Sequence, residues 1–120
     1  GGRLSGAADA ARARADQAKA RYEQAVLTSL REAGDALAGV RSARDGVAAS
    51  ATQATALRRA LELAELRYRT GVSGYLEVLD AQRGLFDAEL ALSQAQLGQL
   101  IAAVLLYKAL GGNWSTSASR

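Results

Sequence analysis

The sequence predicts an all-α protein, built as a long antiparallel coiled-coil hairpin of two unequal helices. The 120 residues include no proline, and 49% of them are hydrophobic, a composition that favours uninterrupted helix. Small and apolar side chains recur every seven residues over most of the chain, as in coiled coils. One glycine-marked segment, residues 70–74, interrupts this pattern and predicts the reversal between the helices.

The first helix is predicted over about residues 5–70, with its apolar seam at two heptad positions. The first position is occupied by Val26, Ala33, Val40, Val47, Ala54, Leu61 and Tyr68, and the second by Ala36, Ala43, Ser50, Leu57 and Ala64. The seam keeps its phase across Asp45-Gly46, which favours one continuous helix. A turn there, giving a three-helix bundle, is the alternative. Three glycines within this helix are interpreted as close-packing positions: Gly34, Gly39 and Gly46.

The second helix is predicted over about residues 74–110. Its heptad stripe consists of Leu76, Leu79, Phe86, Leu90, Leu97, Leu100, Val104 and Tyr107. Ser73 is predicted to cap the start of this helix, and Gly111-Gly112 to end it through a residue of positive φ. Residues 1–114 would then form the hairpin, and residues 115–120 a disordered polar tail.

The predicted helices differ greatly in length, at about 100 Å for ~66 residues and about 54 Å for ~36 residues. Half of the longer arm is therefore unpaired, although it carries apolar side chains such as Tyr22, Leu27 and Leu30. These side chains need another surface to cover them. The chain, which starts Gly-Gly and lacks methionine, is therefore expected to be a piece of a larger helical assembly, and the isolated piece is expected to self-associate.

Composition excludes several functional classes. Without cysteine or histidine the chain lacks the usual thiol nucleophile, imidazole base and zinc ligands, so we expect no enzyme activity, catalytic residue, cofactor or metal site. The net charge of +3 is spread among acidic residues and forms no basic face for nucleic acid. The longest apolar-rich stretch, residues 97–107, is shorter than the ~20 residues that cross a bilayer, which predicts no membrane-spanning helix.

Three separated motifs resemble the C-terminal part of TolC-type outer membrane efflux channels. They read AELRYRTGV at residues 64–72, YLEVLDAQ at 75–82 and LYKALGGNW at 106–114, and the stretches YEQAVLT at 22–28 and LREA at 30–33 also fit that family. The resemblance implies a trimer whose outer-membrane β-barrel, absent from this chain, continues into a periplasmic tunnel of α-helical hairpins. This chain would be one such hairpin, in the periplasm of a Gram-negative bacterium. The channel would export small molecules or drugs with a periplasmic adaptor (membrane fusion) protein and an inner-membrane pump.

The resemblance also implies roles for residues at the turn. The adaptor-docking tip would consist of Gly71, Val72, Ser73 and Gly74, and the periplasmic aperture would be lined by Tyr68, Glu77 and Asp80. Some relatives carry a basic residue at the position of Ser73 that helps to lock the aperture. Arg69 is the candidate substitute for that residue here.

Simpler interpretations accompany these roles. Any acid in the first turns of a helix is favoured by the helix dipole, and Asp80 could pair with Arg83. Two acids three residues apart repel mildly, however, which favours the aperture role for Glu77 and Asp80. Gly71 and Gly74 also suit a chain reversal, and Tyr68 also suits the hydrophobic seam. For the whole chain, the alternative function is a non-catalytic interaction module such as an adaptor hairpin.

Overall fold

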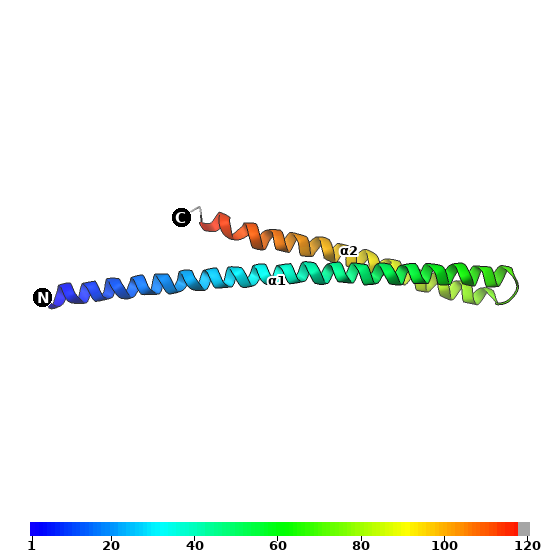
Figure 1. Cartoon of the computed structure of the whole chain (residues 1–120), viewed down its shortest axis with the longest axis horizontal. Coiled ribbons are helices and arrows are strands. Elements are labelled where there is room, and N and C mark those ends of the chain that lie inside the picture. The colour runs from blue at the N-terminus through cyan, green and yellow to red at the C-terminus, as the bar shows by residue number, and fades with distance from the viewer. Residues whose placement is uncertain (118–120) are drawn as a thin grey trace.

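The computed structural model describes residues 1–117, with side chains over residues 1–111. Helix α1 spans Gly2–Arg69 and helix α2 spans Tyr75–Ser117, and the two run antiparallel on either side of a short turn (Figure 1). Together they form a rod of 104 × 22 × 16 Å. The predicted all-α hairpin of two unequal helices is confirmed.

Helix α1 is continuous across Asp45-Gly46, so the alternative of a three-helix bundle is wrong. The predicted seam is the face that α2 covers from residue 33 to residue 64. Val47 and Leu61 are partly buried there, and Ala54 is 1% exposed. The glycine interpretation is not confirmed: a Cβ built at Gly34, Gly39 or Gly46 meets nothing within 4 Å, because these residues lie off the covered face.

The face of α2 that meets α1 differs from the predicted one. The covered positions are Val78, Ala81, Gly84, Leu85, Ala88, Leu92, Ala95, Gln99, Ala102, Leu106 and Ala109. The predicted stripe, from Leu76 to Tyr107, is instead 45–79% exposed at its apolar residues. Helix α2 therefore carries two apolar stripes. The one rich in alanine packs on α1 because two small-residue seams can approach closely, whereas the bulkier stripe faces outward.

Helix α2 continues to Ser117, past the end predicted near residue 110. Among the described residues only Gly71 has a positive φ, so Gly111 keeps a helical conformation and does not cap the helix. Glycine permits a helix to end but does not force it, and no proline follows. Of the predicted disordered tail, residues 115–117 belong to α2 and residues 118–120 lie outside the described part.

Helix α2 is also more apolar over its length than expected. Over Tyr75–Gly111 it is long and apolar enough, by length and composition alone, to cross a membrane, with a mean hydropathy of 1.4 in its most apolar window. The expectation that no stretch reaches this length is therefore wrong. No residue of that window is fully buried in the hairpin, and its apolar side chains that face away from α1 remain available to other helices.

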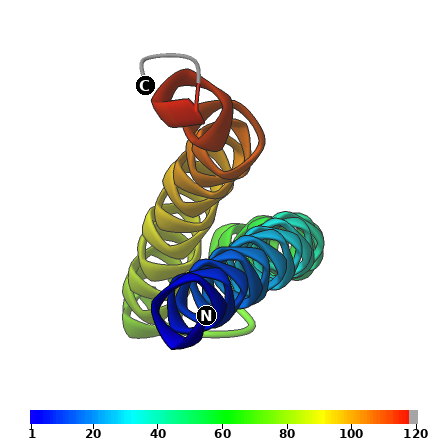
Figure 2. The ribbon, with the colours of Figure 1, turned by 90° about the vertical axis from the view of Figure 1, so that its left-hand side faces the viewer.

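The helices diverge away from the turn, and the N-terminal arm of α1 is uncovered. Figure 2 shows the end of α2 standing apart from α1. Before residue 29 every residue of α1 is exposed, including Tyr22 at 72% and Leu27 at 59%. At 1.5 Å per residue the 68 residues of α1 span about 102 Å and the 43 of α2 about 65 Å, so α2 cannot cover the arm.

The turn between the helices is a Schellman motif. Thr70 caps α1, Gly71 follows with φ 79°, and the N–H of Val72 donates to the carbonyl of Arg67 at 2.8 Å. The N–H of Gly71 donates to the carbonyl of Tyr68 at 3.1 Å, which completes the pattern. Only a residue of positive φ closes this motif, which accounts for glycine at position 71.

Ser73 does not cap α2 as predicted. Because α2 begins at Tyr75, the cap position falls on Gly74. Ser73 lies one residue too early, since its N–H donates to the carbonyl of Arg67 at 3.3 Å and so still belongs to the end of α1. Its buried Oγ makes no hydrogen bond in the described structure.

We expect alanine at two glycines to change stability in opposite directions. Gly71→Ala should lower the free energy of unfolding by about 1–2 kcal/mol, because a Cβ is strained at positive φ. Gly46→Ala should raise it by about 0.5–1 kcal/mol, because this site is helical and open. Urea unfolding of the 120-residue chain checks both. A loss of stability in Gly46→Ala would contradict a continuous α1.

The isolated hairpin should self-associate or fray before residue 36. Its arm and the outer stripe of α2 expose apolar side chains that one chain cannot cover. Sedimentation and hydrogen exchange measure the two outcomes. A monomer whose arm is fully protected from exchange would contradict this expectation.

Candidate functional site

The candidate site is the tip of the hairpin, where the reversal brings the predicted residues together. Tyr68 lies in the last turn of α1, residues 71–74 form the turn, and Glu77 and Asp80 lie in the first two turns of α2. The predicted aperture residues and the predicted docking residues therefore share one end of the rod.

An aromatic pair joins the two helices at the tip. The ring centroids of Tyr68 and Tyr75 are 5.1 Å apart and the ring planes are tilted by 58°, within the range of favourable aromatic pairing. Each tyrosine is about half exposed, so Tyr68 is not a buried residue of the seam as the alternative interpretation has it. Tyr75 was not among the predicted site residues.

An ion pair lies beside the aromatic pair. The Nε of Arg67 is 3.3 Å from Oε1 of Glu77, and the two side chains are 45% and 44% exposed. Exposed ion pairs contribute about 0–1 kcal/mol, so this one orients Glu77 more than it stabilises the fold. The suggested pair of Asp80 with Arg83 does not form: in the part of the chain that the structure describes, Asp80 has no ion-pair partner.

Sequence reasoning missed Arg67 and Tyr75 because each acts through a partner across the turn. A signal was present, however. Arg67 and Glu77, which have opposite charges, lie at nearly equal sequence distances on either side of Val72. The two aromatic residues Tyr68 and Tyr75 do so as well. In an antiparallel hairpin, side chains at equal distances from the turn meet.

A small hollow lies between the helices at the tip. Its volume is about 300 Å³, and it is lined by Glu65, Tyr68, Arg69, Tyr75, Val78 and Gln82. Arg69, the candidate substitute for the basic lock residue, therefore lines the same hollow as both tyrosines. Within the described residues no group of three or more acids could hold a metal ion.

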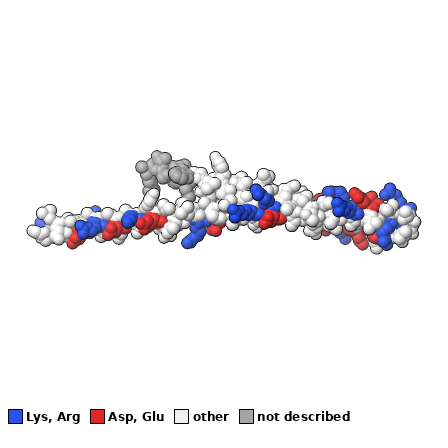
Figure 3. All heavy atoms as spheres, in the orientation of Figure 1, with Lys and Arg blue, Asp and Glu red and all other residues white. Residues whose placement is uncertain are grey.

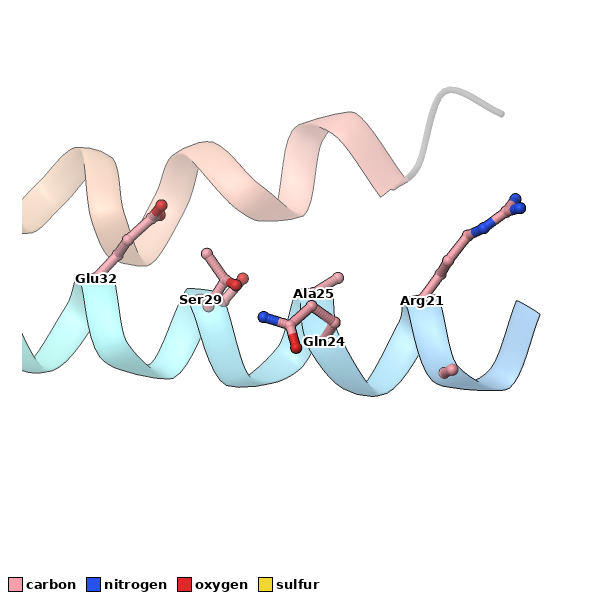
Figure 4. A pocket seen from close by; sticks show the side chains of 7 residues that line it. Arg21, Gln24, Ala25, Ser29 and Glu32 are labelled. Carbon is pink, nitrogen blue, oxygen red and sulfur yellow. The ribbon is translucent and has the colours of Figure 1, made fainter. Parts of the chain in front are cut away.

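A larger hollow lies along α1, where α2 stands away from it (Figure 4). Its volume is about 620 Å³, and its lining consists of Ala20, Arg21, Gln24, Ala25, Thr28, Ser29 and Glu32. All of these residues belong to one helix face, so the hollow is the uncovered side of the N-terminal arm. It shows no convergence of polar groups from different elements such as a ligand pocket has.

The chain matches known proteins over nearly its whole length. The family model for outer membrane efflux proteins matches residues 1–112. The chain is 40% identical to the solvent efflux pump outer membrane protein SrpC of Pseudomonas putida, over 97% of this chain and 25% of that protein. It is also 40% identical to outer membrane protein OprJ of Pseudomonas aeruginosa, over 99% of this chain and 25% of OprJ.

Solved structures agree with these sequence matches. The structure of the outer-membrane channel OprN superposes with a TM-score of 0.68 at 37% identity, covering 86% of this chain and 23% of OprN. The chain thus spans about a quarter of the length of the curated relatives it matches. From the match of the family model over residues 1–112, the chain belongs to the outer membrane efflux protein family.

Proposed function

We propose that this hairpin is a segment of the periplasmic tunnel of an outer membrane efflux channel. The second apolar stripe of α2 carries this proposal. A helix in the wall of a tunnel has neighbours on both sides and needs an apolar face toward each of them. Helix α2 has one face against α1 and another, with Leu97 58% and Leu100 67% exposed, against solvent.

The intact channel would be a homotrimer in the outer membrane of a Gram-negative bacterium, with this hairpin in the periplasm. It would work with a periplasmic adaptor protein and an inner-membrane pump, and its substrates would be small molecules or drugs. Family membership supports these assignments, as do relatives named for solvent and antibiotic efflux. Gly71 to Gly74 would form the docking tip for the adaptor, where the turn presents few bulky side chains.

An adaptor hairpin is less well supported, because the family model for outer membrane efflux proteins matches residues 1–112 of this chain. Catalysis is also not part of the proposal. The ionisable side chains at the tip form one ion pair and no arrangement of nucleophile, base and orienting group.

The outer stripe of α2 gives a direct test. Changing Leu100 and Val104 to Gln in the full-length channel should reduce the fraction of trimer, because polar side chains would then lie between neighbouring helices. Native gels of outer-membrane extracts measure the trimer, and susceptibility of the cells to exported compounds measures transport. Normal trimer and normal efflux at unchanged expression would contradict the tunnel role.

The acids at the tip give a second test. Three copies of Glu77 and Asp80 near the tunnel axis would concentrate negative potential in a narrow entrance. Replacing both with Ala in the reconstituted full-length channel should lower cation selectivity and remove block by multivalent cations, with the trimer intact. Planar-bilayer recordings measure both quantities. If they do not change in an assembled trimer, the helix-dipole interpretation replaces the aperture role.

A further inference from the structure

The two acids of the tip differ in their surroundings. Glu77 lies in the first turn of α2, where the free N–H groups favour a negative charge, and its carboxylate is 3.3 Å from the guanidinium of Arg67. Asp80 lies one turn further along. In the described structure no basic side chain comes within ion-pair distance of Asp80.

We propose that Arg67 determines the cation selectivity of the tip. Arg67 holds Glu77 in a neutral pair, so of the two aperture acids Asp80 is the one that is free to bind a cation. This inference rests on the proposed channel function. It narrows the aperture assignment from two acids to one and adds a basic residue to the site.

The backbone around the ion pair is well fixed. The carbonyl of Arg67 accepts N–H groups from both Val72 and Ser73, which anchors this residue in the cap of α1. The neighbouring Tyr68 and Tyr75 rings pack across the same gap and join the two helix ends. The backbone positions of Arg67 and Glu77 are therefore set by the turn, and forming the ion pair orders only the two side chains.

The hairpin contains a matched control. Arg58 and Glu89 form a second ion pair between α1 and α2, with Nη2 and Oε1 3.2 Å apart and similar exposure of 52% and 49%. This pair lies along the rod, away from the turn. Neutralising it removes the same two charges but leaves the tip unchanged.

The test compares charge-neutral and charge-changing variants of the full-length channel in planar bilayers. The probe is La³⁺, added on the side of the tip. The double variant Arg67→Gln with Glu77→Gln should keep the La³⁺ concentration for half block within about twofold of wild type, and so should Arg58→Gln with Glu89→Gln. Asp80→Asn should raise the La³⁺ concentration for half block about tenfold. This is the effect expected from removing three carboxylate charges, one per chain of the trimer, at about 10 Å from a trivalent ion in salt solution.

Two further variants separate charge from structure. Arg67→Gln alone should strengthen block, because it frees the carboxylate of Glu77. The exchange of Arg67→Glu with Glu77→Arg should keep wild-type block, since it restores a neutral pair. If the neutral double variant does not assemble, this exchanged variant takes its place in the test of the neutral pair.

The outcomes distinguish this inference from the channel function on which it rests. If the neutral Arg67 and Glu77 double variant weakens block as much as Asp80→Asn does, Glu77 binds cations itself and the inference is wrong. The aperture role would then stand with both acids. If block in an assembled trimer changes neither in Asp80→Asn nor in the variant with both Glu77 and Asp80 changed to Ala, the aperture role fails and this inference fails with it.

Discussion

The contact between two small-residue seams is the constraint on which the rest of the hairpin depends. Its most buried side chains are Ala54, Ala64, Val78 and Ala88, and among the described residues no large side chain is fully buried. Alanine seams allow helix backbones to approach closely but remove little apolar area from water, and burial contributes only about 25 cal/mol per Å². The hairpin is therefore well specified in register but gains little hydrophobic stabilisation of its own.

The same constraint explains where the bulky apolar residues lie. If the seam between the helices takes small side chains, leucines such as Leu97 and Leu100 must occupy other faces of α2. A soluble monomer rarely exposes so continuous an apolar surface, and such surfaces usually mark an interface. The incomplete core and the exposed stripe thus have one cause: the small side chains lie between the helices and the large ones lie on the outer face of α2. Both favour a hairpin that is completed by neighbouring helices.

Much of this architecture could be predicted from the sequence, because heptad phase and glycine position are local signals. The phase from Val40 to Val47 predicted a continuous α1, and Gly71 predicted the turn. The contact face of α2 could not be predicted in the same way. Hydrophobic periodicity favours the stripe with the bulkiest side chains as the contact face. In the structure Ala88 packs on α1 and Phe86 faces outward, because the distance between the two helices at this position admits only a small side chain.

The tip, too, could be predicted from the sequence only in part. Motifs assigned Tyr68, Glu77 and Asp80 to one site, and all three lie within two turns of the reversal, but their roles remain proposals. Motifs do not reveal which acid a neighbouring base neutralises, since that depends on the geometry of the turn. Arg67 reaches Glu77 because the Schellman motif sets how the two helix ends face each other.

The distribution of charge along the rod extends this reasoning from the tip to the whole hairpin. Residues 91–107 of α2 contain no charged side chain, whereas α1 alternates basic and acidic residues along its N-terminal half (Figure 3). A helix with neighbours on both sides has little surface left for charge, because an unpaired buried charge is costly. A helix with one side in water can carry charges there at little cost. By this criterion α2 is the more enclosed helix in the proposed tunnel wall, and α1 provides more of the wetted surface.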